Sequence, residues 1–499
     1  MPNLKISQLP AAAALAGTEL VPVVQGGITE QTTVQGVLRS AIVAGTGTDN
    51  TAVGPNTLAA NTTGCQNVAV GTNALLTNCG GNFNSAMGVN ALRDNTSGNS
   101  NSAVGVNALL CNTTGNDNGA VGVNALRCNT TGCQNSAMGV NALRCNTTGG
   151  NNSAVGVNAL LCNTTGNDNG AMGVDALRSN TTGSQNSAMG VNALRSNTSG
   201  TSNSAMGVSA LFCNTTGSGN SAMGTNTLYY NTTGAQNSAV GASALQSNTT
   251  GCNNNAVGAN ALLCNTTGSS NNAMGSSALR CNTTGCQNNA VGLNALYNNA
   301  TGNDNNAMGV NALRDNTTGN NNSAMGYQAL VCNTTGGNNS AMGVSALLRN
   351  TTGNDNGAVG VNALRCNTTG SSNSAVGVQA LCANTTGGNN SAVGVNALRC
   401  NTTGCQNSAM GRDAGCAITT GSTNIAIGHA IQVDSPTADN QINIGGRYFH
   451  DRFIYTERVD PAAPAADNVI VYAKDNGSGK TQLVARFATG AVQVLATEP

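Results

Sequence analysis

The chain has 499 residues, of which 65 are glycine, 2% are aromatic and 8% are charged, and its formal net charge is zero. So much glycine and so few aromatic side chains exclude a set of ordinary globular cores. Zero net charge gives no reason to expect binding to nucleic acid or to anionic membranes. No apolar run is long enough to span a membrane. The Ala-rich N-terminus is a poor match to a secretory signal, because Pro10 interrupts it and Glu19 follows closely. We therefore expect a repetitive protein, folded where it is made, without membrane insertion.

Residues 1–51 carry no repeat, but they contain a hairpin signal. The strand-like runs E-L-V-P-V-V and I-T-E-Q-T-T-V flank Gly26 and Gly27, which predicts two antiparallel strands. The segment is an attachment module, a cap that shields the first unpaired edge of the following repeats, or both.

Residues 52–446 repeat with a period of seventeen. Glycine recurs at this spacing from Gly54 to Gly445 without an insertion, and a second glycine follows ten residues after the first from Gly64 to Gly421. A typical unit, residues 118–135, reads N-G-A-V-G-V-N-A-L-R-C-N-T-T-G-C-Q-N. We count positions within a unit from the first glycine as position 0, so that Gly122 is position 0 of its coil. Such strict periodicity predicts a solenoid of stacked coils.

The residues within each unit predict β-structure. Two glycines and N-T-T-G in nearly every unit exclude long helices. We predict two short strands per coil, one at S-A-M-G-V and one at A-L-R-C. Position 4 is leucine from Leu58 to Leu398 and is predicted to face inward, whereas the variable position 5 is predicted to face solvent. Asparagine recurs at positions 2, 7 and 13, which predicts amide ladders along the stack.

The first strand has two apolar faces. Ala120 and Gly122 lie on one face, and Val121 and Val123 lie on the other. One face packs inside its own coil, so the other requires a second chain. The sequence therefore predicts an all-β fold, a parallel β-solenoid or β-roll of 17-residue coils. We expect it to be wound as a parallel homotrimer with small β-rich terminal modules.

Ten of the 18 cysteines fall at position 6 and five at position 11. Serine, aspartate and threonine replace cysteine at position 6 in other coils, which favours a small, half-buried free thiol. The alternative is a disulfide that clips the turn between positions 6 and 11. Three coils carry both cysteines: Cys128–Cys133, Cys281–Cys286 and Cys400–Cys405.

Residues 447–499 form a different C-terminal module. Pro461 and Pro464 mark a linker, and V-I-V-Y-A-K, K-T-Q-L-V-A-R-F and A-V-Q-V-L-A-T then predict a three-stranded meander. The module is either a trimerising cap without a ligand or a tip that contacts a host receptor. The candidate receptor contacts are Tyr448, Phe449, His450, Arg452 and Tyr455.

No pattern of catalytic residues stands out. The chain lacks a recognisable Ser/His/Asp set, carboxylate pair or phosphate loop, so we expect no enzymatic activity and no cofactor. The two histidines, His429 and His450, lie outside the regular coils, and the aspartates at turn tips lack the dense pattern of calcium-binding solenoids. We therefore expect no metal. Asn-Thr-Thr is formally a glycosylation acceptor, which would stay bare in a phage protein and lie at an exposed bend in a secreted one.

Three stretches resemble known families. The N-S-A-[MV]-G core resembles the head repeats of trimeric autotransporter adhesins, and N-T-T-G-x-x-N-S-A-[MV]-G-x-N-A-L resembles arrays in fibre proteins of phages and algal viruses. Residues 4–34 are similar to the N-terminal segment of phage tail-fibre proteins. Residues 474–499 resemble a small C-terminal module of tailed-phage structural proteins, notably those of phages that infect cyanobacteria.

These resemblances imply a tail fibre of a phage virion. Such a fibre is a rigid trimeric spacer that mediates host attachment after assembly in the host cytoplasm. Its N-terminus would bind other tail or baseplate proteins, and its C-terminus a host surface glycan or protein. The alternative is an extracellular bacterial adhesin or filament subunit at the cell surface.

Overall fold

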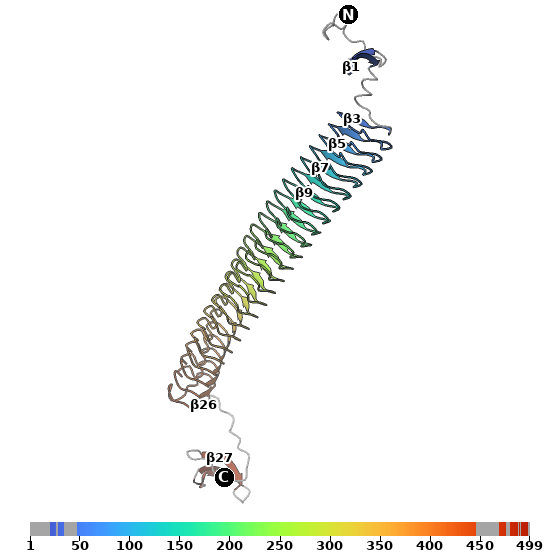
Figure 1. Ribbon diagram of the computed structural model, residues 1–499. Helices are drawn as coiled ribbons and strands as arrows, with labels where there is room; N and C mark the ends of the chain where they lie inside the picture. The colour runs from blue at the N-terminus through green and yellow to red at the C-terminus, as the bar shows by residue number, and fades with distance from the viewer. Residues whose placement is uncertain are drawn as a thin grey trace, which may run out of the picture.

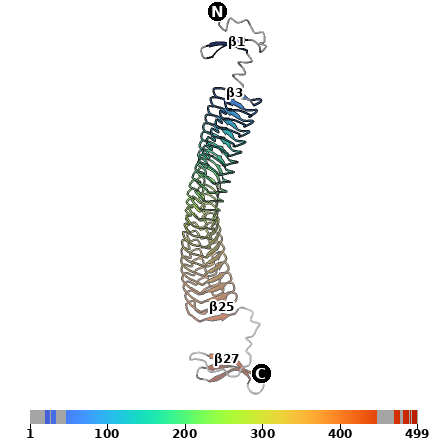
Figure 2. The ribbon, with the colours of Figure 1, turned by 45° about the vertical axis from the view of Figure 1, so that its right-hand side comes forward.

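The computed structural model describes residues 20–25, 28–33, 47–445, 469–475, 480–487, 489 and 491–497. These residues contain strands and turns but no helix. Residues 47–445 form a parallel β-solenoid, which Figures 1 and 2 show as one slender, gently twisted rod. The predicted all-β parallel β-solenoid of 17-residue coils is confirmed.

Each turn of the solenoid contributes one strand of three residues. The strands are β3 (Thr51–Val53), β4 (Val68–Val70), β5 (Ser85–Met87), β6 (Ser102–Val104), β7 (Gly119–Val121), β8 (Ser136–Met138), β9 (Ser153–Val155), β10 (Gly170–Met172), β11 (Ser187–Met189), β12 (Ser204–Met206), β13 (Ser221–Met223), β14 (Ser238–Val240), β15 (Asn255–Val257), β16 (Asn272–Met274), β17 (Asn289–Val291), β18 (Asn306–Met308), β19 (Ser323–Met325), β20 (Ser340–Met342), β21 (Gly357–Val359), β22 (Ser374–Val376), β23 (Ser391–Val393), β24 (Ser408–Met410), β25 (Ile425–Ile427) and β26 (Ile442–Ile444).

Neighbouring strands pair in parallel and in register. Ala171 of β10 pairs with Ala188 of β11, which pairs in turn with Ala205 of β12. Because the period never changes, each side chain lies above the residue at the same position of the coil below. Parallel strands lie about 4.8 Å apart, so the stack from Gly54 to Gly428 is roughly 105 Å long.

The second predicted strand, at A-L-R-C, is wrong, because these residues form turns. In the segment that follows strand β7, every second residue has a positive φ: Gly122 at 133°, Asn124 at 59° and Leu126 at 49°. Alternating left-handed residues bend the chain back on itself and prevent an extended run. A left-handed leucine costs about 1–2 kcal/mol. Complete burial of the Leu126 side chain offsets this cost by about 1.5–3 kcal/mol.

The core of each coil has an apolar half and a polar half. Alanines at positions 15 and 3 and leucine at position 4 are buried beneath the strand and the corner that follows it, as Ala120, Ala125 and Leu126 illustrate. The asparagines at positions 7 and 13, such as Asn129 and Asn118, are equally buried. They lie beneath the N-T-T-G turn, where the core contains amides instead of hydrocarbon.

Hydrogen bonds satisfy this polar half completely. Asn129 Nδ2 donates to Oδ1 of Asn112 at 2.8 Å and to the carbonyl oxygen of Gly132 at 2.9 Å. Asn118 Nδ2 donates to the same Gly132 carbonyl at 2.9 Å, and Asn118 Oδ1 accepts the backbone N–H of Asn135 at 3.0 Å. Both asparagine columns therefore converge on the glycine at position 10. The predicted amide ladders are confirmed.

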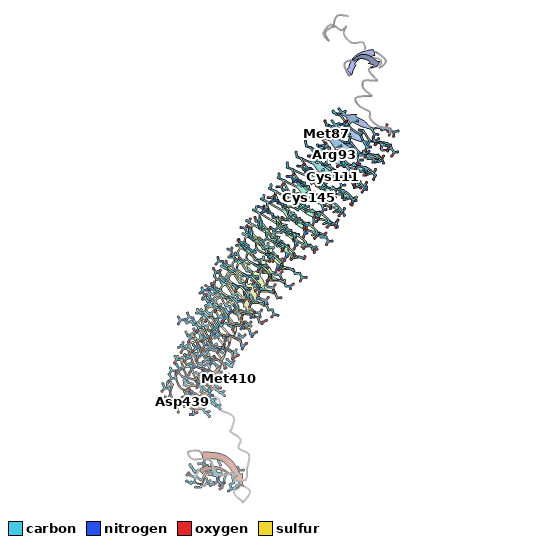
Figure 3. All side chains as sticks on the ribbon, viewed as in Figure 1. Met87, Arg93, Cys111, Cys145, Met410 and Asp439 are labelled. Carbon is cyan, nitrogen blue, oxygen red and sulfur yellow. The ribbon has the colours of Figure 1, made fainter. Side chains whose placement is uncertain are left out.

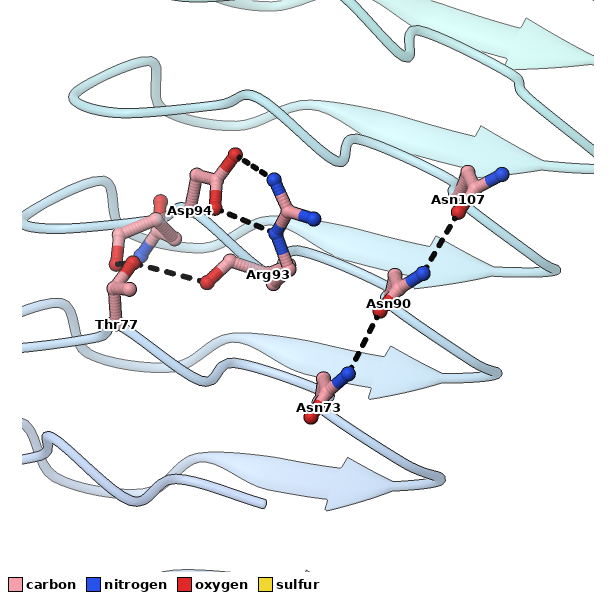
Figure 4. Close-up of polar contacts among 7 residues, drawn as sticks. Asn73, Thr77, Asn90, Arg93, Asp94 and Asn107 are labelled. Atoms are coloured by element: carbon pink, nitrogen blue, oxygen red, sulfur yellow. Dashed lines mark hydrogen bonds and ion pairs between the residues drawn. The ribbon is translucent and has the colours of Figure 1, made fainter. Parts of the chain in front are cut away.

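A third asparagine column follows the corner at position 2. Asn73 Nδ2 donates to Asn90 Oδ1, and Asn90 Nδ2 to Asn107 Oδ1, each at 3.1 Å (Figure 4). The prediction that position 5 faces solvent is wrong for most coils. Arg93 is half-buried and forms an ion pair with Asp94 at 2.7 Å, and Leu110 is only 6% exposed. That prediction relied on the variety of residues at position 5, but the left-handed leucine at position 4 turns the chain so that these side chains lie against the shaft.

The predicted hairpin and meander at the two ends are confirmed. β1 (Leu20–Gln25) pairs antiparallel with β2 (Ile28–Thr33). β27 (Val469–Asp475), β28 (Thr481–Phe487) and β29 (Val492–Thr497) form an antiparallel sheet in that order.

Candidate interaction surface

One face of the long sheet is apolar and exposed. In almost every strand the middle alanine is buried, and the residue at position 16 points outward. Met138 is 56% exposed and Val140, at position 1 of the next coil, is 43% exposed. Figure 3 labels Met87 near one end of the shaft and Met410 near the other. We call the exposed side chains at positions 16 and 1 the apolar face.

The position-16 side chains of the apolar face repeat at every level of the shaft. Eleven of the 12 methionines of the chain belong to this face. They are Met87, Met138, Met172, Met189, Met206, Met223, Met274, Met308, Met325, Met342 and Met410, all at least 44% exposed. Soluble monomers rarely expose a contiguous apolar patch of more than a few hundred Å². A stripe roughly 105 Å long therefore has the character of an interface, and flexible methionines suit packing against a partner.

The cysteines are free thiols in the structure. At position 11, Cys133 Sγ accepts the backbone N–H of Asn116 at 3.3 Å and donates to the carbonyl oxygen of Thr131 at 3.4 Å. Where serine or asparagine occupies position 11, its side-chain oxygen accepts the equivalent N–H, as Ser184 Oγ does from Asn167 at 3.0 Å. Cysteine at the turn tip therefore acts as a hydrogen-bonding group that serine can replace. The alternative bridges, Cys128–Cys133, Cys281–Cys286 and Cys400–Cys405, are not formed.

The cysteines at position 6 are half-buried, as predicted. Burial raises the pKa of the Cys145 thiol, and the neighbouring thiols of Cys128 and Cys162 raise it further. Burial likewise raises the pKa of Cys111 and Cys332. A raised pKa keeps these thiols protonated and poorly nucleophilic. Their chemistry fits a packing role.

The Asn-Thr-Thr rows do not offer an accessible acceptor amide. The asparagine at position 7 is buried, and Asn129 uses Nδ2 in two hydrogen bonds inside the shaft. The expectation that this row lies at an exposed bend is wrong for the asparagine, because the turn points its amide into the core. In most coils only the second threonine, such as Thr131, is exposed.

The described residues contain no group of three or more His, Cys, Asp or Glu side chains placed to hold a metal ion. His429 is exposed. The candidate receptor contacts Tyr448, Phe449, His450, Arg452 and Tyr455 lie outside the described residues. In the part of the chain that the structure describes, no helix has the length and apolarity needed to cross a membrane.

The sequence matches no family model, and neither a curated protein nor a solved structure matches the chain.

Proposed function

We propose that the protein is a structural, non-enzymatic fibre, in which three parallel copies pack through the apolar face into a rigid spacer. Its place is the tail of a phage virion, with the N-terminal segment on other tail or baseplate proteins and the C-terminal module toward a host surface glycan or protein. The repeat, and the resemblance of both ends to phage fibre proteins, support this assignment.

The observation that carries the proposal is the apolar face, in which position 16 is Val, Met or Ile at every level from Val53 to Ile444. Most coils expose two large apolar side chains, such as Met189 at 45% and Val191 at 43%, although position 1 is small or polar in the four coils that contain Thr225, Ala242, Ala259 and Ser276. Burial of apolar surface contributes about 25 cal/mol per Å², and it accumulates over every level of the shaft. A long interface between identical parallel solenoids, which share the same twist, removes the face from water.

Light scattering on the purified chain tests the assembly, and negative-stain images test its shape. The wild type is expected as a trimeric rod. Changing Met189, Met206 and Met223 to lysine is expected to weaken the trimer while leaving the buried core intact. The matched control changes Ser187, Ser204 and Ser221 of the same strands to asparagine, which occurs at this position in β15–β18. A monomeric wild type would refute the assembly. Failure of specific antibodies to label virions would refute the placement in a phage tail.

A further inference from the structure

Charged residues of the regular coils pair in the sequence at a fixed spacing. Aspartate occurs at the turn tip, position 12, and arginine at position 5 of the following coil. Between Gly54 and Gly428, every tip aspartate is followed ten residues later by an arginine: Asp117 by Arg127, Asp168 by Arg178, Asp304 by Arg314 and Asp355 by Arg365. Coils without this arginine carry Asn, Ser, Gln, Gly or Thr at the tip, except that Asp49 in the incomplete first turn precedes Ala59.

The two charges lie on opposite borders of the apolar face. Asp117 is exposed at the tip that leads into β7, two residues before the strand begins. Arginines at position 5 reach the corner just past the strand end, because Arg178 and Arg195 both contact Asp175 at position 2, at 3.8 and 3.9 Å. We call the row of tip aspartates the acidic edge and the row of position-5 arginines the basic edge.

The acidic edge has no cationic partner within the described residues. All ion pairs there join an arginine to an aspartate at position 2 or 6, namely Asp94, Asp175, Asp315 and Asp413. Asp117 and Asp355 are exposed and form no ion pair in that part of the chain, and neither do Arg127 and Arg365. Each aspartate and the arginine ten residues later lie within 17 consecutive residues, which is one full turn of the solenoid. The two edges therefore carry their charges at the same height along the shaft.

We propose that neighbouring copies pack parallel and in register, with the acidic edge of one chain against the basic edge of the next. This inference rests on the proposed assembly through the apolar face, and it adds what sets the register. In register, all four tip aspartates meet an arginine of the neighbour. Sliding the neighbour by one coil leaves two such pairs in one direction and none in the other, and sliding it by two coils leaves at most three.

Charge reversal on the full-length chain tests this arrangement. One variant carries Asp117→Lys and Asp355→Lys, a second carries Arg127→Glu and Arg365→Glu, and a third combines all four changes. The control places lysine at two neutral tips, Asn151→Lys and Asn321→Lys, which are followed ten residues later by Leu161 and Val331. Its backbone is matched, because φ at the four substituted tips lies between 56° and 58°.

Analytical ultracentrifugation measures the concentration at which each assembly dissociates. The acidic-edge and basic-edge variants are each expected to raise it by about tenfold or more, because like charges then face each other. The combined variant is expected to restore the wild-type value, and the control to leave it unchanged. A trimeric wild type whose single-edge variants dissociate normally would overturn the charge pairing and leave the proposed function standing. A combined variant that still dissociates more readily than the wild type would also overturn the charge pairing. A monomeric wild type would overturn both.

Discussion

The buried asparagine at position 13 provides the sharpest test of the polar half-core. Asn220 lies in the middle of the shaft and is 1% exposed. Its Nδ2 donates to Asn203 Oδ1 at 3.2 Å and to Gly234 O at 2.8 Å, and its Oδ1 accepts the backbone N–H and the Nδ2 of Asn237 at 3.0 and 3.1 Å. The change Asn220→Ser shortens the side chain and removes these four bonds. At about 0.5–1.5 kcal/mol each, with the buried N–H of Asn237 left unpaired, the local cost is about 3 kcal/mol.

Hydrogen exchange can read this cost at the affected turn, because coils of a solenoid interact mainly with their neighbours. Amides of β13 and β14 are expected to exchange about a hundredfold faster in the variant, with little change in coils far from it. The control is Asn141→Ser at the half-buried position 2, where Ser209 already occurs. Its expected cost is below about 1 kcal/mol. Equal exchange in the two variants would refute the assignment of stability to the buried ladder.

Three further outcomes follow from single contacts. Gly122→Ala is expected to make its coil sensitive to proteases, because φ is +133° and the new Cβ would lie 2.5 Å from the carbonyl oxygen of Gly139. In the control Gly119→Ala, the new Cβ meets no atom within 4 Å, so this variant should resist digestion like the wild type. Cys133→Ser should change the free energy of unfolding by less than about 0.5 kcal/mol, since serine at the same position of another coil accepts the equivalent N–H. A larger loss would contradict the conclusion that serine can replace cysteine at this position. Burial raises the pKa of Cys145 above its ordinary 9.0, so timed alkylation at pH 8 should label this thiol more slowly in the folded chain than in the urea-unfolded chain. The protonated thiol's contribution to folding stability should be lost as the pH rises through the folded-state pKa. Equal labelling rates would contradict the raised pKa.

Hydrogen bonds between neighbouring coils explain why some positions of the repeat vary and others do not. Position 11 accommodates Asn, Ser and Cys, each of which supplies an acceptor at the tip, and it also accommodates Gly and Ala, as at Gly150 and Ala235, which supply none. Positions 7 and 13 stay asparagine through the regular coils, because only a side chain with both an acceptor and two donors can bond to the coils before and after it and to the glycine carbonyl.

The sequence alone determined the period, the stacking and the amide ladders. A constant spacing from Gly54 to Gly445 leaves coaxial stacking as the arrangement in which each side chain meets its own kind, and hydrogen-bonded ladders require that register. Exposure of Val121 was also predictable, since a three-residue strand can bury only one of its faces.

Only the tertiary structure decided the path of the chain after the strand. Propensity favours a strand at A-L-R-C, but Leu126 adopts a left-handed backbone because burial of its side chain against the coils above and below outweighs the local strain. That choice turns Arg127 back against the shaft at the border of the apolar face. It also directs the amide of Asn129 into the core. Such placements depend on contacts between residues a full coil apart, which no local pattern contains.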